Sequence, residues 1–482
     1  MITFAIAILL LLAGYLFYGR VIEKIIAPTD NPTPAIAHPD GVDFTPMKKG
    51  KVFLIQLLNI AGTGPIFGPL MGAVFGPVVF LWIVFGSILG GAVHDFLSGM
   101  VSVRNDGASI SEIVGKYLGT VAKQVMRIFS VVLLVCVGAV FTTSPAGLLA
   151  RLTPDFMNTT FWIVVIMGYY VLATILPIDK IIGKFYPVFG VVLMIMAIGI
   201  SGGLVFGGYE LPELTASNFA NLHPGGKPIW AYMFITVACG AVSGFHSTQS
   251  PMMARCIESE KQGRMVFYGA MLAEAVIALV WAAAGLGFYG NTGSLSEALA
   301  SLGQSGVVYD ISVGVLGKVG GALAIIGVVV CPISTGDTAF RSARLTLSDW
   351  FKLDQSTIGK RLILATPLIG VAAVLTQIDF DIIWRYFSWS NQTLAMIVLW
   401  TVSVYLVKNA KKKVYSLVSA LPATFMSAVS ITYILMADEG FKITSDIAYP
   451  AGIAVAIVLF VVFLVYMIRS KKHGNSLDGN CR

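Results

Sequence analysis

Long apolar runs alternate with short polar segments along almost the whole chain. Each apolar run covers about 17–25 residues, which is enough for a helix to cross a hydrocarbon core of about 30 Å. The runs lie near 2–20, 52–75, 77–101, 125–150, 160–177, 185–207, 229–251, 265–289, 307–333, 361–376, 382–406, 414–436 and 449–469. The pattern therefore predicts an all-α polytopic membrane protein with about thirteen transmembrane helices.

Composition agrees with a membrane protein and excludes an ordinary soluble domain. Of the 482 residues, 56% are hydrophobic and only 12% are charged, and the mean hydropathy is +0.83. Soluble domains carry about 25% charged residues. The five cysteines show no C-x-x-C spacing, so we infer neither disulfides nor a cysteine metal cluster.

The basic residues gather in alternate connections between the runs. If the N-terminus lies outside the cytoplasm, most of the 32 lysines and arginines fall in cytoplasmic segments, among them the loop 21–51 and the tail 470–482. This asymmetry follows the positive-inside rule. The net charge of +7 therefore indicates topology, and we expect no nucleic acid partner.

Three segments outside the regular pattern have their own expected structures. The run within 1–20 has no basic residue before it and no clear cleavage site after it, so we interpret it as an extra, permanent N-terminal helix. The loop 21–51 contains five prolines and is predicted to be irregular. The segment 337–350 is too interrupted for a span and is predicted to be an amphipathic helix on the cytoplasmic surface.

Two spans are interrupted by glycine and proline. The second span reads N-I-A-G-T-G-P-I-F-G-P from Asn59, and the seventh reads V-A-C-G-A-V-S-G-F-H from Val237. Proline removes a backbone donor and glycine lowers the cost of unwinding, so both spans should be broken helices. Freed backbone groups at membrane depth are tolerated only in protein or beside a watery cavity, so the breaks mark a candidate binding site. A kink without ligand contact is the alternative.

The interrupted spans occupy matching positions in the order of spans. Five spans lie within 52–207 and five within 229–406, and each set begins with its interrupted helix. Because five is odd, the two sets enter the membrane from opposite sides, which predicts an inverted repeat around a site at the middle of the membrane. Two further helices are predicted within 414–469.

Several ordered motifs resemble the carbon starvation protein A (CstA) family. They are G-T-G-P-I-F-G-P from Gly62, G-A-V-H-D-F from Gly91, R-N-D-G-A-S from Arg104, C-G-A-V-S-G-F-H from Cys239, D-T-A-F-R-S-A-R from Asp337 and W-R-Y-F-S-W-S-N-Q-T-L-A from Trp384. The resemblance implies a LeuT-like five-plus-five fold related to the amino acid–polyamine–organocation superfamily. It further implies a bacterial inner-membrane carrier of peptides or pyruvate. The asymmetry of basic residues, and not the resemblance, predicts a periplasmic N-terminus and a cytoplasmic C-terminus. The chain resembles the shorter branch of the family, and it has His94 where longer relatives are expected to have glutamine.

Polar residues near the two breaks and in the eleventh span are candidates for binding substrate. An arginine can hold a carboxylate with two hydrogen bonds, whereas an interfacial ion pair is the alternative for Arg385. The candidates are Gln56, Asn59, Thr63, Gly64, Gly240, Ser243, Gly244, Arg385, Asn391 and Gln392.

Ionisable residues inside spans are costly in lipid and are candidates for carrying a coupling proton. His94, Asp95, His246 and Glu274 form this set, and a divalent metal at the first three is a less favoured interpretation. The resemblance implies that Ser334 and Thr335 could bind a sodium ion against the first broken helix. Helix capping is their alternative role.

These features predict a secondary active transporter, and not an enzyme, that imports an anionic or zwitterionic substrate with a proton or a sodium ion. Apart from that ion, we expect no cofactor. The expected partners are the small-molecule substrate and the lipid bilayer, and the oligomeric state is left open. An intramembrane hydrolase using Ser243 and His246 is a second hypothesis, although no carboxylate is evident to orient the pair. A nutrient sensor without transport is a third.

Overall fold

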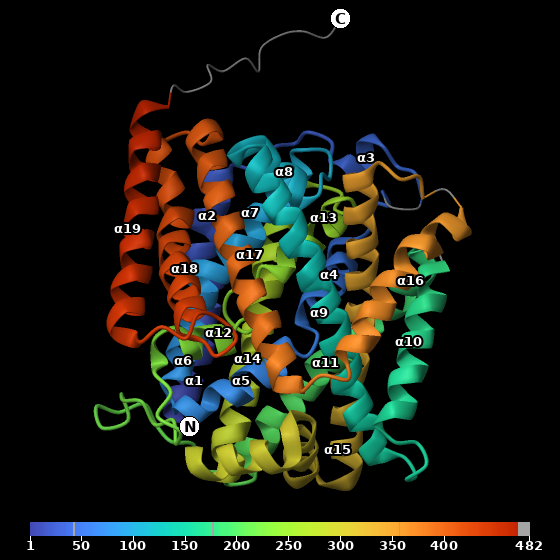
Figure 1. The fold of residues 1–482 in the computed structure, drawn as a ribbon, viewed down its shortest axis with the longest axis vertical. Coiled ribbons are helices and arrows are strands. Elements are labelled where there is room, and N and C mark those ends of the chain that lie inside the picture. Colours follow the sequence, from blue (N-terminus) through green and yellow to red (C-terminus); the bar gives the residue numbers. More distant parts are fainter. Residues whose placement is uncertain (42–43, 176–177, 356, 471–482) are drawn as a thin grey trace, which may run out of the picture.

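The computed structural model describes residues 1–41, 44–175, 178–355 and 357–470, and these residues form a bundle of helices (Figure 1). Of the predicted tail 470–482, all but Ser470 lies outside the described residues. In chain order the helices are α1 (Ile2–Ala13), α2 (Gly19–Ile26), α3 (Pro34–Ala37), α4 (Lys49–Ala61), α5 (Gly64–Gly72), α6 (Val79–Leu81), α7 (Ala92–Val103), α8 (Ile110–Leu118), α9 (Thr120–Leu152), α10 (Thr159–Ile175), α11 (Ile178–Phe206), α12 (Phe234–Thr236), α13 (Phe245–Ala254), α14 (Ala270–Tyr289), α15 (Thr292–Phe351), α16 (Ile358–Leu375), α17 (Phe380–Asn409), α18 (Leu417–Met436) and α19 (Ser445–Arg469).

The described residues contain 10 helical segments that are long and apolar enough to cross a membrane, or 11 with the bent pair α4 and α5. The predicted total of about thirteen also counts the shorter apolar helix α10 and the broken segment that contains α12 and α13. That total stays a prediction. The first span is longer than the predicted 1–20, since α1 and α2 form one segment that ends at Ile26.

The helix α15 corrects two predictions about the ninth span. Gly303 (φ 67°) and Gly317 (φ 68°) are non-helical and divide α15 into three pieces, so the last piece begins after Gly317 and not at 307. Residues 337–344 are buried within that piece, so the predicted surface helix at 337–350 is wrong. The charged side chains are buried because they find partners inside the protein. The Tyr186 hydroxyl lies 3.0 Å from Asp337 Oδ2, and Arg341 Nη2 donates to the Ala173 carbonyl at 3.3 Å.

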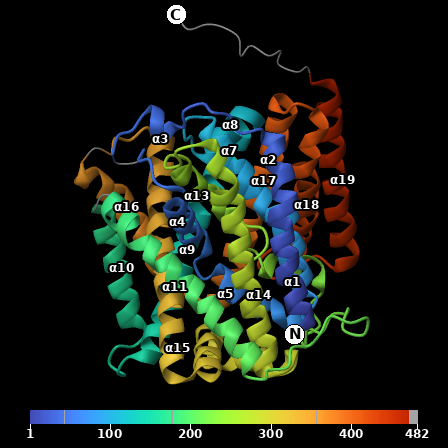
Figure 2. The same ribbon diagram turned by 180° about the vertical axis from the view of Figure 1, so that it is seen from behind.

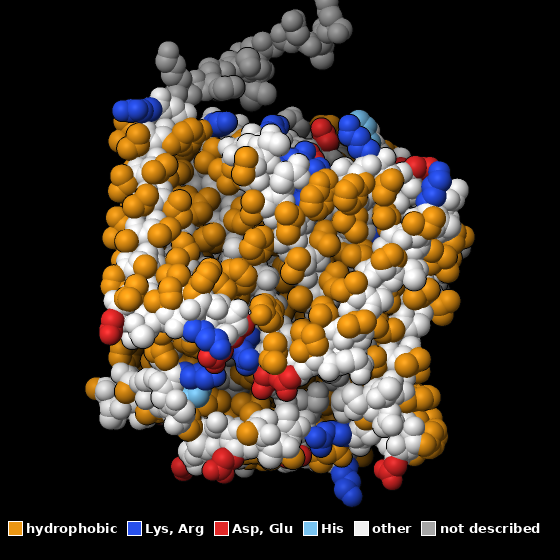
Figure 3. Space-filling view, in the orientation of Figure 1, with side chains coloured by type: hydrophobic (Ala, Val, Ile, Leu, Met, Phe, Trp, Pro, Cys, Tyr) orange, Lys and Arg blue, Asp and Glu red, His pale blue; other side chains and the backbone are white. Residues whose placement is uncertain are grey.

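The two ends of the described chain lie at opposite ends of the bundle. The N-terminus marks one side, called here the N side, and the end of α19 marks the other, called the C side, together with α3 and α8 (Figures 1 and 2). Between them the visible face carries a broad band of hydrophobic side chains, with charged side chains mostly above and below it (Figure 3). Such a band matches a surface that faces lipid. Which side faces the cytoplasm stays a prediction.

The first predicted break separates α4 from α5. Helix α4 ends because Gly62 adopts φ 53° and ψ −141°, a conformation that costs glycine little. Pro65 then lies in the first turn of α5, where its missing N–H is not needed. The two helices are bent by 47°. The prediction of a broken second span is therefore confirmed.

The second break is longer, because 237–244 is unwound between α12 and α13. Its carbonyl groups accept hydrogen bonds from the neighbouring third span. Trp82 Nε1 donates to the Val237 carbonyl at 3.2 Å, and the Ser87 hydroxyl donates to the Gly240 carbonyl at 3.1 Å. Irregular backbone at this depth persists only when protein satisfies it in this way.

The two breaks pack directly against each other. A Cβ atom at Gly64 would lie 2.3 Å from the Cβ atom of Cys239, and one at Gly68 would lie 3.0 Å from the Thr236 carbonyl oxygen. Small residues permit such an approach between helices, as they do generally in membrane proteins. Gly91 also lies against the unwound segment, since a Cβ atom there would lie 2.1 Å from the Ala241 carbonyl oxygen.

This contact predicts the effect of adding one methyl group. Gly91→Ala should destabilise the protein by about 1–3 kcal/mol, because the backbone of Ala241 must move to admit it. The matched control is Gly370→Ala in α16, where an added Cβ meets nothing within 4 Å. Thermal unfolding in detergent measures both, and equal melting temperatures for the two variants would contradict the tight packing described here.

Candidate functional site

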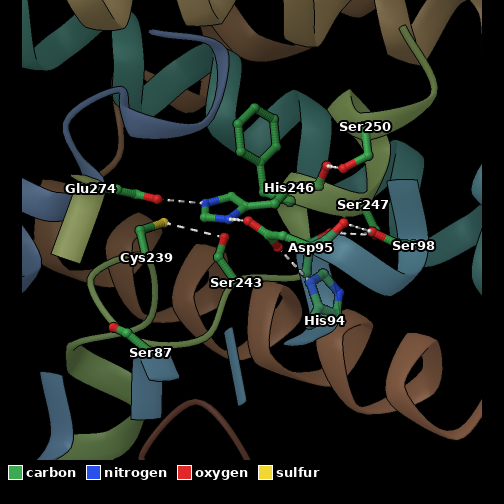
Figure 4. A network of polar contacts seen from close by, with 12 residues as sticks. Ser87, His94, Asp95, Ser98, Cys239, Ser243, His246, Ser247, Ser250 and Glu274 are labelled. Carbon is green, nitrogen blue, oxygen red and sulfur yellow. Dashed lines mark hydrogen bonds and ion pairs between the residues drawn. The ribbon is translucent and has the colours of Figure 1, made fainter. Parts of the chain in front are cut away.

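Four of the predicted coupling residues meet in one fully buried row beside the second break (Figure 4). Asp95 on α7 lies at its centre, with Oδ1 at 2.7 Å from Nδ1 of His94 and Oδ2 at 2.8 Å from Nδ1 of His246. On the far side of the His246 ring, Nε2 lies 3.3 Å from Oε2 of Glu274 on α14. Three helices therefore bring two carboxylates and two imidazoles together inside the bundle.

The hydrogen bonds of Asp95, together with the 3.3 Å contact between His246 and Glu274, limit where the protons of this row can lie. An ionised Asp95 accepts on both oxygens, so each imidazole carries a proton on Nδ1. His246 Nε2 is then either protonated and facing an ionised Glu274, or bare and facing a protonated Glu274. A third state, with Nε2 bare and Glu274 ionised, holds one proton fewer than either of these, so the row is suited to taking up and releasing a proton at this 3.3 Å contact.

The less favoured interpretation of a divalent metal at His94, Asp95 and His246 stays a prediction. Within the described part of the chain, no group of three or more His, Cys, Asp or Glu side chains is placed to hold a metal ion. His94 and His246 both direct Nδ1 at the carboxylate of Asp95, within hydrogen-bonding distance.

Asn391 fastens the unwound segment to α17. Its Oδ1 accepts the backbone N–H of Phe245 at 2.6 Å and the hydroxyl of Ser243 at 3.2 Å, and its Nδ2 lies 3.3 Å from Cys239 Sγ. Its backbone carbonyl accepts the N–H of Gly244 at 3.1 Å. One side chain and its own peptide group thus set the shape of the second break.

The same contacts argue against Ser243 as the nucleophile of a hydrolase. Its hydroxyl donates to the Asn391 amide, whereas His246 faces the carboxylates of Asp95 and Glu274. A hydrolase of the predicted kind needs the hydroxyl to donate to the imidazole.

Three predicted substrate-binding residues on the first broken helix are buried without partners. Gln56, Asn59 and Thr63 are fully buried, and among the described residues their side-chain oxygen and nitrogen atoms have no hydrogen-bond partner. An unsatisfied buried polar group costs about 1–3 kcal/mol. Three such groups at the break are therefore suited to binding a polar ligand.

Ser334 and Thr335 lie against the first broken helix. Thr335 Oγ1 donates to the Leu58 carbonyl at 2.9 Å and to the Cys331 carbonyl at 3.0 Å, and Ser334 Oγ lies 2.7 Å from the Cys331 carbonyl. Two hydroxyl and two carbonyl oxygens from α4 and α15 are thus gathered together. Oxygen ligands of this kind suit a hard cation.

The last two predicted binding residues lie on α17 at different places. Gln392 Nε2 donates to the Phe234 carbonyl at 3.1 Å, which holds the start of the second broken helix. Arg385 lies apart from the buried row, pairs through Nε with Glu439 Oε2 at 3.2 Å, and lines a separate cavity of about 270 Å³. It therefore has the ion pair that was its alternative role.

Sequence reasoning missed a buried acidic residue close to the hydroxyl pair. The Tyr186 hydroxyl lies 3.0 Å from Asp337 Oδ2 and 3.1 Å from the Ser334 carbonyl, which links Asp337 to that pair. The available signal was a carboxylate three residues after Ser334 on one helix. It was hidden because the polar run after Asp337 resembles a surface helix.

Comparison with known proteins places this geometry among membrane transporters. A family model described as "Carbon starvation protein CstA" matches residues 1–157 and 149–286. An uncharacterized membrane protein of Haemophilus influenzae is 42% identical, over 62% of this chain and 95% of its own length. The Campylobacter jejuni protein named "Peptide transporter CstA" is 26% identical, over 93% of this chain and 82% of its own.

Among solved structures, MhsT in complex with L-phenylalanine is similar with a TM-score of 0.55 and 15% identity, over 86% of this chain and 98% of that one. At that identity the likeness shows the fold alone. The predicted LeuT-like fold is confirmed, whereas the repeat boundaries at 52–207 and 229–406 stay predictions.

The role of Asn391 can be tested by stability. Asn391→Leu keeps a similar volume but leaves the Phe245 N–H and the Ser243 hydroxyl without their acceptor, so it should cost about 1–3 kcal/mol for each. The control is Asn409→Leu at the end of α17, where the amide donates to the Tyr405 carbonyl. Thermal unfolding and the rate of Cys239 labelling should change in the first variant alone. A wild-type melting temperature with Cys239 still protected would contradict the assignment.

Proposed function

Since the chain belongs to the carbon starvation protein CstA family, we propose that it is a secondary transporter that imports a small anionic or zwitterionic solute together with a proton. The observation that carries this proposal is the fully buried row of Asp95, His246 and Glu274 directly beside two interlocked helix breaks. Buried ionisable groups in a membrane protein commonly belong to proton relays.

The breaks supply the features that a small anion needs. Helices α5 and α13 begin at Gly64 and Phe245, so their N-terminal ends, which carry partial positive charge, both border the unwound segments. The unpartnered amides of Gln56 and Asn59 add hydrogen-bonding groups from α4. A carboxylate bound between the breaks would be stabilised by these groups, as in other carriers with discontinuous helices.

Coupling would arise because the row spans three helices. Asp95 lies on α7, His246 on α13 and Glu274 on α14, so any movement of the second broken helix changes the distances among them. Separating His246 from Glu274 leaves a buried charge without its partner, a cost of about 3–5 kcal/mol. Transfer of the Nε2 proton to Glu274 before the two side chains separate would leave both sides of the contact neutral and avoid that cost, which links the position of the proton to the movement of the broken helix.

The substrate class follows from the relatives and remains a proposal for this chain. The Campylobacter jejuni and Bacillus subtilis relatives are named peptide transporters, at 26% identity each. The family resemblance of the sequence motifs also implies pyruvate. We therefore propose short peptides or pyruvate as the substrate class.

A second candidate for coupling is a sodium ion. The oxygens of Ser334, Thr335 and the carbonyls of Leu58 and Cys331 would supply its ligands. A sodium ion there would join α15 to the first broken helix, which is the helix that carries the unpartnered polar groups.

The proton pathway is tested with Glu274→Gln. The amide holds no transferable proton, so uptake of labelled Ala-Ala or pyruvate into proteoliposomes should lose its response to an inward pH gradient and fall at least about tenfold, equivalent to about 1.4 kcal/mol. The matched control is Glu297→Gln, an exposed carboxylate in α15, which should behave as wild type. Uptake by Glu274→Gln that still follows the pH gradient would exclude this residue from coupling.

The sodium dependence of uptake is tested with Thr335→Val in α15. Thr335→Val removes one oxygen of the hydroxyl pair, so any stimulation of uptake by an inward sodium gradient should be lost. Thr338→Val is the control, because this buried hydroxyl three residues later donates to the Thr335 carbonyl. If sodium stimulates the wild type and Thr335→Val equally, the site lies elsewhere.

A further inference from the structure

A cavity of about 270 Å³ opens on the N side of the two breaks. Its walls come from six parts of the chain: the end of α5 with the turn after it, the loop residues His223 and Lys227, the start of the second broken helix, residues 296–304 of α15, the first turns of α17, and Tyr433 of α18. In the same region, Lys and Arg side chains gather beside a histidine and acidic side chains in the lower part of the visible face (Figure 3).

The cavity carries charges of both signs. Arg385 and Lys227 line it and provide positive charge. Arg385 uses Nε for Glu439, and a guanidinium has four further N–H donors. Asp381 also lines the cavity, and its Oδ1 accepts from Gln304 Nε2 at 2.7 Å, so its second oxygen remains as an acceptor.

His223 contributes a neutral donor to the same cavity. Burial and the neighbouring Lys227 lower the pKa of His223 below its usual range, so the ring is neutral near pH 7. The backbone N–H of Gly225 donates to Nδ1 at 3.0 Å, which places the ring proton on Nε2. The ring also packs edge-on against Phe75 with centroids 4.7 Å apart.

Two buried polar atoms in the lining are unsatisfied. Trp384 Nε1 and Ser388 Oγ belong to residues that are almost fully buried, and neither atom has a hydrogen-bond partner among the described residues. Native structures leave few buried polar groups without a hydrogen-bond partner, so each of these atoms is suited to binding a ligand or a water molecule. They lie on α17 one turn apart, on the wall that also carries Asp381 and Arg385.

We propose that this cavity is a second binding site, separate from the buried row, which receives a short zwitterionic peptide before it reaches the breaks. The carboxylate would be held by Arg385 and Lys227, and the ammonium group by Asp381. The aromatic ring of Trp384 and the apolar Met71 and Ile235 would pack on the side chains of the peptide.

This proposal rests on the proposed transport function and narrows its substrate class. Pyruvate has a carboxylate but no ammonium group, so it would leave the second carboxylate oxygen of Asp381 without a donor. The cavity also contacts both broken helices, through Met71 and Thr236, so an occupant would touch the elements that must move during transport.

A labelling experiment on the purified full-length protein tests the site directly. Ala300 is exposed and lines the cavity, so Ala300→Cys in a Cys481→Ser background reports occupancy through its rate of reaction with a charged thiol reagent. The other native cysteines are buried. The probes are Ala-Ala, N-acetyl-Ala-Ala and pyruvate.

Ala-Ala should slow labelling, whereas N-acetyl-Ala-Ala and pyruvate should do so only at much higher concentration. Arg385→Lys keeps the charge but loses the two-point geometry, and it should raise the Ala-Ala concentration for half protection by about tenfold. Asp381→Asn should remove the preference for Ala-Ala over its acetylated form. Protection should persist in Glu274→Gln, which separates this site from the transport step.

Absence of protection by Ala-Ala, or equal protection by all three probes, overturns the proposal even if the protein transports peptide. Protection that is insensitive to both Arg385→Lys and Asp381→Asn also overturns it. Conversely, a wild-type protein that moves no substrate but shows the expected protection leaves the site standing and removes the transport function.

Discussion

Unwound backbone in the middle of a membrane must be satisfied by protein, and the rest of this structure depends on how that is done. The two breaks solve the problem together. Gly64 and Gly68 bring α5 into contact with Cys239 in the unwound segment and with Thr236 at the end of α12, while the third span supplies donors from Trp82 and Ser87. The irregular segments therefore exist only as a pair, which places their free polar groups at one location.

The buried row of His94, Asp95, His246 and Glu274 lies beside that location, and this position allows it to respond to the breaks. His246 is the second residue of α13, which begins directly after the unwound segment. Its ring therefore cannot move independently of the break. Both its nitrogens face carboxylates, at 2.8 Å and 3.3 Å. A change in the break is therefore a change in the electrostatics of the row, which is the physical basis for coupling a proton to a substrate.

Sequence predicted the two breaks, the fold and the members of the row, because glycine and proline clustered within one span free backbone groups at membrane depth, and because ionisable side chains are rare inside spans. It could not show that His94 and His246 share Asp95, since that depends on how α7 and α13 pack. It misplaced the segment after Asp337, because a polar run reads as surface when its partners, Tyr186 and Ala173, lie far away in sequence. It also could not show that Arg385 lines a separate cavity, since the walls of that cavity come from segments far apart in the sequence.

Proton movement driven by substrate alone tests the central claim most directly. Proteoliposomes with equal pH on both sides, free of sodium and loaded with a pH-sensitive dye, receive Ala-Ala or pyruvate on the outside. Reciprocal coupling predicts that the interior becomes acidic as substrate enters, and that a gradient of one pH unit sustains about tenfold accumulation at one proton per substrate. Substrate entry without internal acidification would contradict the account.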